Sequence, residues 1–500
     1  MEKRIQKLLL SKVLKLALKK QTNALTTFSN QLSNSYPKIK PPINYDPTLN
    51  PVGMDVGTTR CCVAVNRNDG INVVAIDNID RPLPSYIGYE EKIPKCGKIV
   101  CSRIKHHFKS TVFDIKRIIG KSFGSIVIDP NWPFKVFEEN GIVKIATIGC
   151  ENIEIFLSPE EITAVLIKHM KKEVENFQGQ LVFEAVITVP AEFNQTQINA
   201  TIEAAKLAGL ETINILPEPI AACLTYASQQ QIHENSTVLL FDLGGGTLDV
   251  CIVKIEHENL HILKSCGDQY LGGRDFDTIL MNHFLAVLKE GYQIDLINDS
   301  DNAKLLKRYK LMLLCQEIKH DLQTAESAWL DVSDIDPNFD KQIIIKRDDF
   351  EKLSAGLLLR IKFKILESIN SLNLGLNDID FVLQVGGGCR MLVIKELLKS
   401  VFPNSQHRCT IDPDWAVAYG ATLYSYYLKT KAVNEVMEEV VHEAAHPQDL
   451  EPVQTIPHVE EPNTQSEPPS APIQEELDEK PRLHTKDKIK REVIRFVKKV

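Results

Sequence analysis

The chain has 500 residues, 43% of them hydrophobic and 25% charged, which is an ordinary globular composition with room for several domains. A formal net charge of −8 argues against broad nucleic-acid binding, because such binding needs a basic surface that displaces the counterions around phosphates. The eleven cysteines lack the spacing of a zinc site, and no apolar run approaches the length of a transmembrane helix.

A basic amphipathic helix is predicted over residues 3–20, where apolar residues recur at helical spacing opposite lysines. The lysines interrupt the apolar side, so a secretory signal is not expected. Three interpretations stay open: a helix on a membrane surface, an organelle transit peptide, and a solvated extension. Residues 37–51 are rich in Pro and Asn and are expected to form a linker, which makes residues 1–50 an extension before the core.

From residue 51 to about residue 430, strand-like runs alternate with helical stretches, which predicts sheets covered by helices. The clearest of these elements are the strands Val182–Val189, Val238–Phe241 and Phe381–Val385 and the helices Glu160–Glu175 and Gln197–Ala208.

The composition changes after this region. Pro and Glu dominate residues 431–485, and such a segment cannot bury enough apolar surface to offset the entropy lost on ordering, so a disordered tail is expected. Residues 486–500 carry apolar side chains at helical spacing among basic ones, which is typical either of a short helix for a partner or membrane surface or of a fraying basic tail. No peptide-binding domain is expected after the core.

One pattern occurs twice in the core. Residues 52–59 and 238–247 each contain an apolar strand, an Asp, a Gly-containing turn and a Thr before a second strand. Glycines let backbone N–H groups approach phosphate oxygens, and Thr hydroxyls add further donors. The carboxylates of Asp55 and Asp242, at the strand ends, suit Mg²⁺, which prefers oxygen ligands. The duplication therefore predicts two lobes around a nucleotide-binding cleft, with these two Asp residues on opposite walls.

Two other Gly-containing turns carry less information. Gly120–Ser122 has the ending of a Walker A loop but lacks its earlier glycine, so that loop is excluded. Gly386–Gly388 follows a predicted strand and could let the backbone pack on a flat ring or a ribose, although a simple tight turn explains it equally well.

With these residues in place, the chain resembles the ATPase domain of the 70-kDa heat shock protein family from about Val52 to Leu428. The segments that carry the resemblance occur in the family's order, and they are Asp55–Thr59, Pro84–Tyr86, Val112–Arg117, Val186–Ala191, Glu218-Pro219, Phe241–Asp249, Leu271–Gly273, Asp275–Asp277 and Asp412–Ala421. Trp132–Val136 and Ala191–Phe193 are most similar to the truncated, microsome-associated stress-70 branch, which keeps the ATPase core and lacks the peptide-binding domain.

The resemblance implies an α/β, two-lobed actin/hexokinase/heat-shock-type ATPase fold, with duplicated sheet-plus-helix subdomains around the nucleotide cleft. Lobe I is expected at residues 51–230 and lobe II at residues 231–430, with a C-terminal helix near 413–428 returning to lobe I. The implied function is that of a slow ATPase acting as a divergent chaperone or co-chaperone in protein folding and the stress response. The alternative is a nucleotide-binding interaction protein with weak or no hydrolysis. A sugar kinase of the same superfold is disfavoured by the heat-shock Glu-Pro and Leu-Gly-Gly motifs.

The resemblance also implies a role for each site residue. Lys116 would be the catalytic lysine, stabilising charge on the γ-phosphate and the attacking water, and Asp55 and Asp242 would hold Mg²⁺. The other residues with an implied catalytic role are Glu218, Thr247 and Asp249, besides Asp242 itself. The residues implied to bind the nucleotide are Gly57, Thr58, Thr59, Gly244, Gly245, Gly246, Gln316, Lys319, His320, Gln323, Gly386, Gly387, Gly388, Arg390 and Asp414. The implied cofactors are ATP or ADP and Mg²⁺, with K⁺ as a further candidate.

The chain departs from the family pattern around this site, mainly at its base end. Gln316 stands where the family usually has Glu, His320 where it has Arg, and Gln323 where it has Ser. Arg60 replaces a Tyr after the first phosphate turn, and Gly388-Cys389 replaces Ser-Thr. These changes put nucleotide affinity and base preference in question more than phosphate chemistry.

The expected partners are ATP, protein co-chaperones or clients, and a membrane surface contacted by the basic N-terminal helix, without nucleic acid and without a transmembrane segment. The lack of a clear signal favours the cytoplasm, whereas the branch resemblance favours association with the endoplasmic reticulum or microsomes. Because both ends offer little apolar surface, deleting residues 1–45 and 435–500 is expected to leave the stability of the core almost unchanged.

Overall fold

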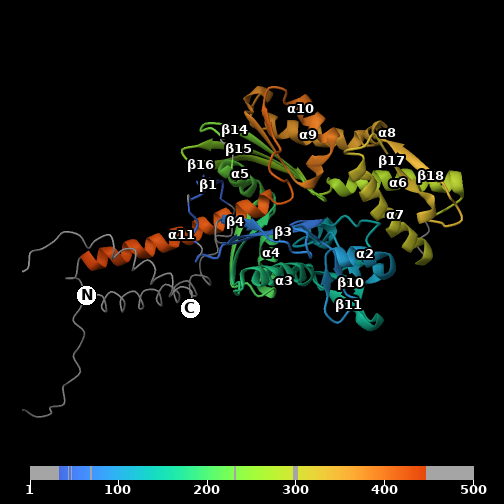
Figure 1. Ribbon diagram of the computed structural model, residues 1–500, viewed down its shortest axis with the longest axis horizontal. Coiled ribbons are helices and arrows are strands. Elements are labelled where there is room, and N and C mark those ends of the chain that lie inside the picture. Colours follow the sequence, from blue (N-terminus) through green and yellow to red (C-terminus); the bar gives the residue numbers. More distant parts are fainter. Residues whose placement is uncertain are drawn as a thin grey trace, which may run out of the picture. The chain divides into compact units, whose positions relative to one another are not determined.

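The computed structural model describes residues 33–445, except positions 43, 47, 68, 69, 230, 231 and 297–301 (Figure 1). The helices predicted at residues 3–20 and 486–500, and the tail after residue 445, lie outside the described residues. The chain divides into two compact units, Ser29–Tyr427 and a second that comprises Met1–Phe28 with Leu428–Val500. Among the described residues, no helix is both long enough and apolar enough to span a bilayer.

The first sheet of the larger unit carries the first Gly-Thr turn. Its strands follow the order β13 (Thr212–Pro217), β12 (Glu184–Val189), β2 (Val52–Val56), β3 (Arg60–Arg67) and β4 (Gly70–Val73), and β5 (Leu83–Pro84) pairs with β3. The strands β2 and β3 form an antiparallel hairpin, and β12 runs parallel to β2, so that Thr188 lies opposite Asp55.

The second sheet repeats this arrangement. Its order is β1 (Ser35–Pro37), β16 (Asn259–Asp268), β15 (Leu248–Glu256), β14 (Thr237–Leu243), β19 (Phe381–Val385) and β20 (Gln406–Arg408). The strands β14 and β15 form the antiparallel hairpin, and β19 runs parallel to β14, so that Val385 lies opposite Asp242. The internal duplication predicted from the two hairpins is therefore a duplication of the sheets around them.

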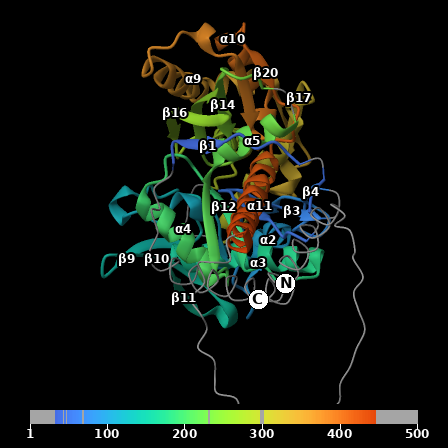
Figure 2. The same ribbon diagram turned by 90° about the vertical axis from the view of Figure 1, so that its left-hand side faces the viewer.

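Helices cover the faces of both sheets (Figures 1 and 2). Their bounds are α2 (Lys98–His107), α3 (Pro159–Gln178), α4 (Gln195–Leu207), α5 (Glu218–Gln229), α6 (Gly273–Tyr292), α7 (Asn302–Asp321), α8 (Arg347–Leu353), α9 (Ala355–Asn370), α10 (Leu392–Val401) and α11 (Ala416–Ala445). Three smaller sheets contain β6 (Ile87–Gly88), β7 (Lys95–Cys96) and β8 (Thr111–Val112), then β9 (Lys135–Glu139), β10 (Ile142–Ile148) and β11 (Glu154–Leu157), and finally β17 (Ser327–Asp331) and β18 (Gln342–Lys346).

Local sequence signals set several helix starts. The Ser158 hydroxyl accepts a hydrogen bond from the Glu161 backbone N–H at 3.1 Å, while the Glu161 carboxylate accepts one from the Ser158 N–H at 2.7 Å. This reciprocal cap satisfies two backbone donors that α3 would otherwise leave without partners, and Pro159 suits the first helical position. Asn194 and Gln197 cap α4 in the same way.

Small residues let α5 and α11 pack closely at the base of the two sheets. A Cβ added to Gly420 of α11 would lie 1.8 Å from the Ala221 carbonyl oxygen of α5, and one added to Gly53 of β2 would lie 2.3 Å from the Thr422 nitrogen. The Thr422 hydroxyl donates to the Ala64 carbonyl of β3 at 2.8 Å. The start of α11 is thereby fixed against both α5 and the first sheet.

The residues before the core do not form a free linker. Strand β1 pairs antiparallel with the edge strand β16, with Tyr36 opposite Leu260 (Figures 1 and 2). Tyr36 and Ile39 are buried, and the ring of Tyr36 meets Tyr424 of α11 edge-on at 6.2 Å. The expectation that residues 1–50 are an extension outside the core is therefore wrong for this segment.

The same segment also contacts the first sheet. The Asp46 N–H donates to the Tyr426 hydroxyl at 2.9 Å, and the Asn66 side chain of β3 donates to the Asp46 carbonyl at 2.9 Å. We call residues 33–42 and 44–46 the N-terminal strap, because they connect the edge of the second sheet with α11 and the first sheet.

The C-terminal boundary also differs from the expectation. Helix α11 continues to Ala445, so the disordered tail expected from residue 431 onward is wrong for residues 431–445. These residues are mainly Ala, Glu, Val, Met and Lys, several of which favour helix, and the first Pro after them is Pro447.

Candidate functional site

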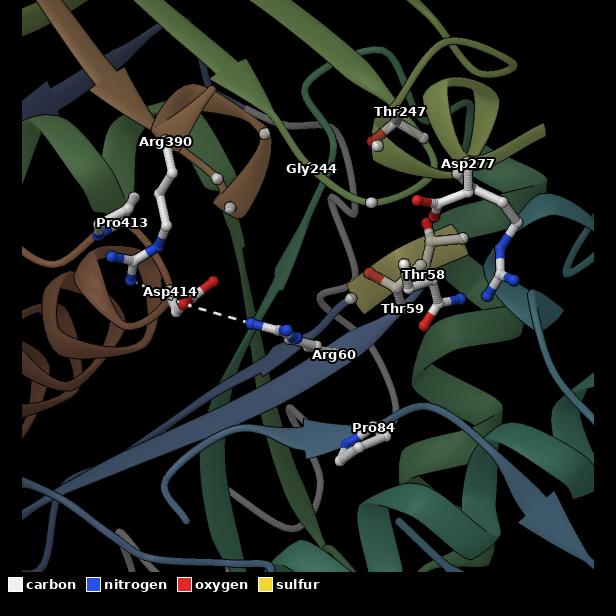
Figure 3. Close-up of a pocket in the computed structure, with 18 of the residues that line it drawn as sticks. Thr58, Thr59, Arg60, Pro84, Gly244, Thr247, Asp277, Arg390, Pro413 and Asp414 are labelled. Atoms are coloured by element: carbon white, nitrogen blue, oxygen red, sulfur yellow. Dashed lines mark hydrogen bonds and ion pairs between the residues drawn. The ribbon is translucent and has the colours of Figure 1, made fainter. Parts of the chain in front are cut away.

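The two sheets end at one cavity of about 550 Å³, and Asp55 from the first sheet and Asp242 from the second both line it. This confirms the prediction that the two carboxylates share one cavity. The other predicted site residues on its wall are Gly57, Thr58, Thr59, Lys116, Glu218, Gly244, Gly245, Thr247, Gln316, Lys319, His320, Gln323, Gly386, Gly387, Gly388, Arg390 and Asp414. Figure 3 labels six of them: Thr58, Thr59, Gly244, Thr247, Arg390 and Asp414.

The two Gly-Thr turns come from different sheets and pack against one another at this cavity. A Cβ added to Gly245 would lie 1.8 Å from the Thr59 hydroxyl oxygen, and one added to Gly246 would lie 2.4 Å from a methyl carbon of Thr58. Side chains at these glycines would push the turns apart. The turns thus bring backbone N–H groups and Thr hydroxyls from both sheets together, which suits a chain of phosphates.

Lys116 lies on a 3-10 turn, Ile115–Arg117, and donates from its ammonium to the Glu218 carboxylate at 2.6 Å. Both side chains are buried. Burial disfavours the ammonium, but Glu218 and then Asp55 outweigh this effect and hold the pKa of Lys116 above its ordinary value. Lys116 is therefore a fixed positive charge in the wall of the cavity.

Three carboxyl groups stand near Lys116, those of Asp242 and Asp249 buried and that of Asp55 half-buried, and burial is the largest cause of a raised pKa in each. The pKa of Asp55 rises to about 6 and that of Asp249 to about 7, and the pKa of Asp242 lies well above its ordinary value. The negative charge of Glu218 raises all three further, because like charges disfavour ionisation. The cluster carries more potential negative charge than Lys116 balances, so a divalent cation with oxygen ligands fits it.

Direct protein ligands are few. Among residues 33–445, where described, no three His, Cys, Asp or Glu side chains lie close enough together to hold a metal ion. Asp55 is held by the Thr188 hydroxyl, which donates to it at 3.0 Å. This donor set fits Mg²⁺, which commonly keeps several waters and takes further oxygens from substrate phosphates.

The raised carboxyl pKa values predict a pH effect. Asp249 has a pKa of about 7 in the folded chain and about 4 when unfolded, so the folded state binds more protons between these pH values and loses stability as pH rises through them. The free energy of unfolding of Asp249→Asn minus that of the wild type, both in EDTA, should therefore be larger at pH 8 than at pH 5, by at least about 1 kcal/mol. Urea unfolding at both pH values measures this difference, and an equal difference at both would contradict the assigned burial cost.

Two predicted site residues lie off the wall of the main cavity. Asp249 instead lines a small second cavity together with Lys116, Thr247 and Glu192, and Gly246 packs against Thr58. The catalytic role implied for Asp249 and the phosphate-binding role implied for Gly246 stay predictions. The negative charge of Asp249 still raises the pKa of Lys116.

The base end of the cavity is formed by α7 and by the turn after β19. The Lys319 ammonium pairs with Asp277 at 2.7 Å and donates to the Gly273 carbonyl at 2.9 Å. Burial, followed by the charge of Lys319, lowers the pKa of His320, so this side chain is a neutral imidazole at neutral pH. Where the resemblance leads us to expect an Arg, this chain therefore has an uncharged side chain.

Gly386 has a close-packing role in the turn after β19. Its φ of +78° favours glycine, and an added Cβ would lie 2.4 Å from an Asp242 carboxylate oxygen. The turn therefore packs directly on the strand end that carries Asp242.

Several wall residues were not predicted, among them Arg60, Tyr86, Arg274 and Asp277. Arg274, at the start of α6, pairs with Asp114 at 3.0 Å and donates to the Tyr86 hydroxyl at 3.0 Å. These contacts connect α6 with the loop before Lys116. A single Arg gives no sequence signal of this kind, because its partners lie far away along the chain.

The comparisons with known proteins agree with this geometry. The family model described as "Hsp70 protein" matches residues 51–446. The heat shock 70 kDa protein of Emericella nidulans is 34% identical over 395 residues, which cover 77% of this chain and 60% of that protein. Heat shock cognate 70 kDa protein 3 of Dictyostelium discoideum is 32% identical over 400 residues, 79% of this chain and 63% of that protein. Heat shock 70 kDa protein BIP3 of Oryza sativa subsp. japonica is 32% identical over 396 residues, 78% of this chain and 58% of that protein.

The chain thus spans about 60% of the length of the curated relatives that it matches. Within that span, the duplicated sheets and the cavity between their Gly-Thr turns have the two-lobed arrangement of the actin/hexokinase/heat-shock-type ATPases. The chain belongs to the 70-kDa heat shock protein family.

Proposed function

We propose that this chain binds Mg²⁺ and ATP in the cleft between the two sheets, hydrolyses the ATP slowly, and acts as a chaperone or co-chaperone. The observation that carries the proposal is the buried Lys116–Glu218 pair, 2.6 Å apart, among three more carboxyl groups and beside two facing Gly-Thr turns. This combination supports phosphoryl transfer, which depends mainly on positioning and charge stabilisation.

Each group has a role in this proposal. The backbone and hydroxyl donors of Thr58, Thr59 and Gly244–Thr247 hold the phosphate chain from both sides. Bound Mg²⁺ would neutralise phosphate charge, with Asp55 and Asp242 holding its waters. The ammonium of Lys116 stabilises the charge that develops on the γ-phosphate and on the attacking water. Glu218 fixes the position of that ammonium.

The chaperone role and the partners are proposed from the names of the relatives. Several are heat shock 70 kDa proteins, and one is named BIP3. Nucleotide binding would favour closed lobes and hydrolysis would relax them, which is how such a cleft could control a protein partner. The proposed partners are co-chaperones or clients, in the cytoplasm or at the endoplasmic reticulum, with membrane contact through residues 3–20.

The proposal is tested by the turnover of ATP by the purified full chain, with Mg²⁺ and with EDTA. Slow production of ADP that needs Mg²⁺ is expected, and Asp242→Asn should remove most of it because the variant loses one carboxylate that holds the cation. A contaminating ATPase would be equally active in both preparations. Absence of ATP binding, or equal turnover by the wild type and Asp242→Asn, would overturn the proposal.

A further inference from the structure

The cations around the cavity differ in how firmly they are held. Four of them have a short bond to a carboxylate: the pairs are Lys116–Glu218 at 2.6 Å, Lys319–Asp277 at 2.7 Å, Arg390–Asp414 at 2.8 Å and Arg274–Asp114 at 3.0 Å. Arg60 has only a longer contact, 3.4 Å from its guanidinium to Asp414. Its side chain is 44% exposed, close to the 43% of Arg390, whereas the side chains of Lys116, Lys319 and Arg274 are 10% exposed or less, so Arg60 is the exposed cation among these five that lacks a short contact.

The backbone of Arg60 is fixed beside the first phosphate turn. Arg60 begins strand β3 directly after Thr58 and Thr59, and it pairs with Pro84 of β5. A Cβ added to Gly57 would lie 2.1 Å from the Arg60 carbonyl oxygen, so the turn is tight. A long side chain on this fixed backbone can reach different points in the cavity while its base stays next to the phosphate-binding residues.

Figure 3 shows the direction that the side chain takes. The Arg60 guanidinium extends from the side of Thr58 and Thr59 toward Asp414, which stands on the opposite side of the cavity beside Arg390. Arg60 therefore crosses the space between the phosphate turns and the segment before α11.

Asp414 does not depend on Arg60 for charge balance. Arg390 donates to it at 2.8 Å and also pairs with Asp412 at 2.7 Å. If Arg60 moved away, Asp414 would keep its shorter bond to Arg390. The exposed 3.4 Å pair is worth little by itself, because solvent screens such pairs. A phosphate chain is a stronger partner, since a guanidinium binds phosphate oxygens with paired hydrogen bonds.

We propose that Arg60 is a phosphate-binding residue that leaves its contact with Asp414 and moves to the phosphate chain of a bound nucleotide. This inference rests on the proposed function and adds a specificity-determining residue to it. It also gives the two ends of the site different charge: His320 of α7 is neutral, whereas Arg60 brings a guanidinium to the end formed by the Gly-Thr turns.

The test measures the affinity of the full chain for ATP, ADP and adenosine by titration calorimetry with Mg²⁺. Arg60→Gln should weaken binding of ATP and ADP by about tenfold or more, the expected effect of losing hydrogen bonds from a charged donor, and leave adenosine binding unchanged. Arg60→Lys should be intermediate, because it keeps the charge but not the paired donors. Arg67→Gln is the matched control, since Arg67 lies at the other end of β3 over the ring of Phe177.

The possible failures are distinct. If the wild type binds ATP and Arg60→Gln binds it equally well, the phosphate role of Arg60 is wrong and the proposed function stands. Equal losses of ATP and adenosine binding would show a role in the shape of the pocket rather than in phosphate binding, and would also overturn the inference. If the wild type binds no ATP, the proposed function and this inference fail together.

Discussion

Replacing Lys116 with Ala should lower the rate of ATP hydrolysis by at least about 100-fold and change the affinity for ATP by no more than about threefold. Preorganised charge at a site where negative charge develops is commonly worth that much in rate. The ground-state phosphates keep their donors from the two Gly-Thr turns, so binding should persist. Single-turnover hydrolysis and calorimetry with ATP measure the two quantities separately.

The buried position of Lys116 adds an expected effect on stability. Its loss leaves Glu218 without the 2.6 Å partner, next to Asp55, Asp242 and Asp249, so the variant without added nucleotide should melt at a lower temperature than the wild type. Mg²⁺ with ADP should restore much of that loss, because the cation supplies positive charge to the same carboxylates and binding favours the folded state.

Lys121→Ala is the matched control for this variant. Lys121 lies five residues further along the same loop, and its ammonium donates to the Tyr270 hydroxyl at 3.3 Å rather than to a carboxylate of the site. The Lys121→Ala variant should hydrolyse ATP at the wild-type rate. Equal losses of binding and turnover in Lys116→Ala would show that the lysine holds the substrate rather than the transition state.

The parts of the fold that follow from local sequence were predictable. The Asp, the Gly-containing turn and the Thr of each hairpin are contiguous, so β2–β3 and β14–β15 and the pairing of two lobes could be inferred from a repeat. Helices α3 and α4 have their caps in the sequence just before them. The shared cavity then followed from the symmetry of the two halves.

The position of Asp249 depends on contacts that are not local. Asp249 lies opposite Asp242 in the hairpin, yet it lines the small second cavity with Lys116 and Thr247. Lys116 reaches this place from a loop of the first lobe, and no spacing in the sequence describes that approach. The same reason hid Arg274, whose partners Asp114 and Tyr86 lie in distant segments.

The N-terminal strap was missed for a different reason. Its strand β1 is three residues long, and it pairs through backbone groups, which every sequence supplies. Tyr36 and Ile39 were the available signal, because large apolar side chains in such a segment suggest that it packs against the core, and both are buried. Composition averaged over residues 37–51 favoured a linker, whereas those two residues bind the segment to the core.

Deleting residues 1–45 should therefore lower the free energy of unfolding by about 3–5 kcal/mol, the usual cost of losing one large buried aromatic side chain. The deletion removes β1, the buried Tyr36 and Ile39, and the ion pair of 3.5 Å between Lys38 and Glu234. It also leaves β16 as an unpaired sheet edge, which promotes association between chains. Urea unfolding together with light scattering measures both effects.

Two kinds of variant that retain the strap distinguish its contribution to stability from that of the residues before it. Deletion of residues 1–32 leaves β1 intact and, as expected from the composition of those residues, should shift the free energy of unfolding by less than about 0.5 kcal/mol. In the full chain, Tyr36→Ala should reproduce most of the loss seen on deleting residues 1–45, and Tyr36→Phe should reproduce little of it, because the ring against Tyr424 is kept. If the proteins lacking residues 1–32 and residues 1–45 are equally stable, the strap does not contribute to the core. The boundary expected from composition, with residues 1–50 outside the core, would then be right. A loss for Tyr36→Phe as large as that for Tyr36→Ala would instead assign the stability to the hydroxyl rather than to the buried ring.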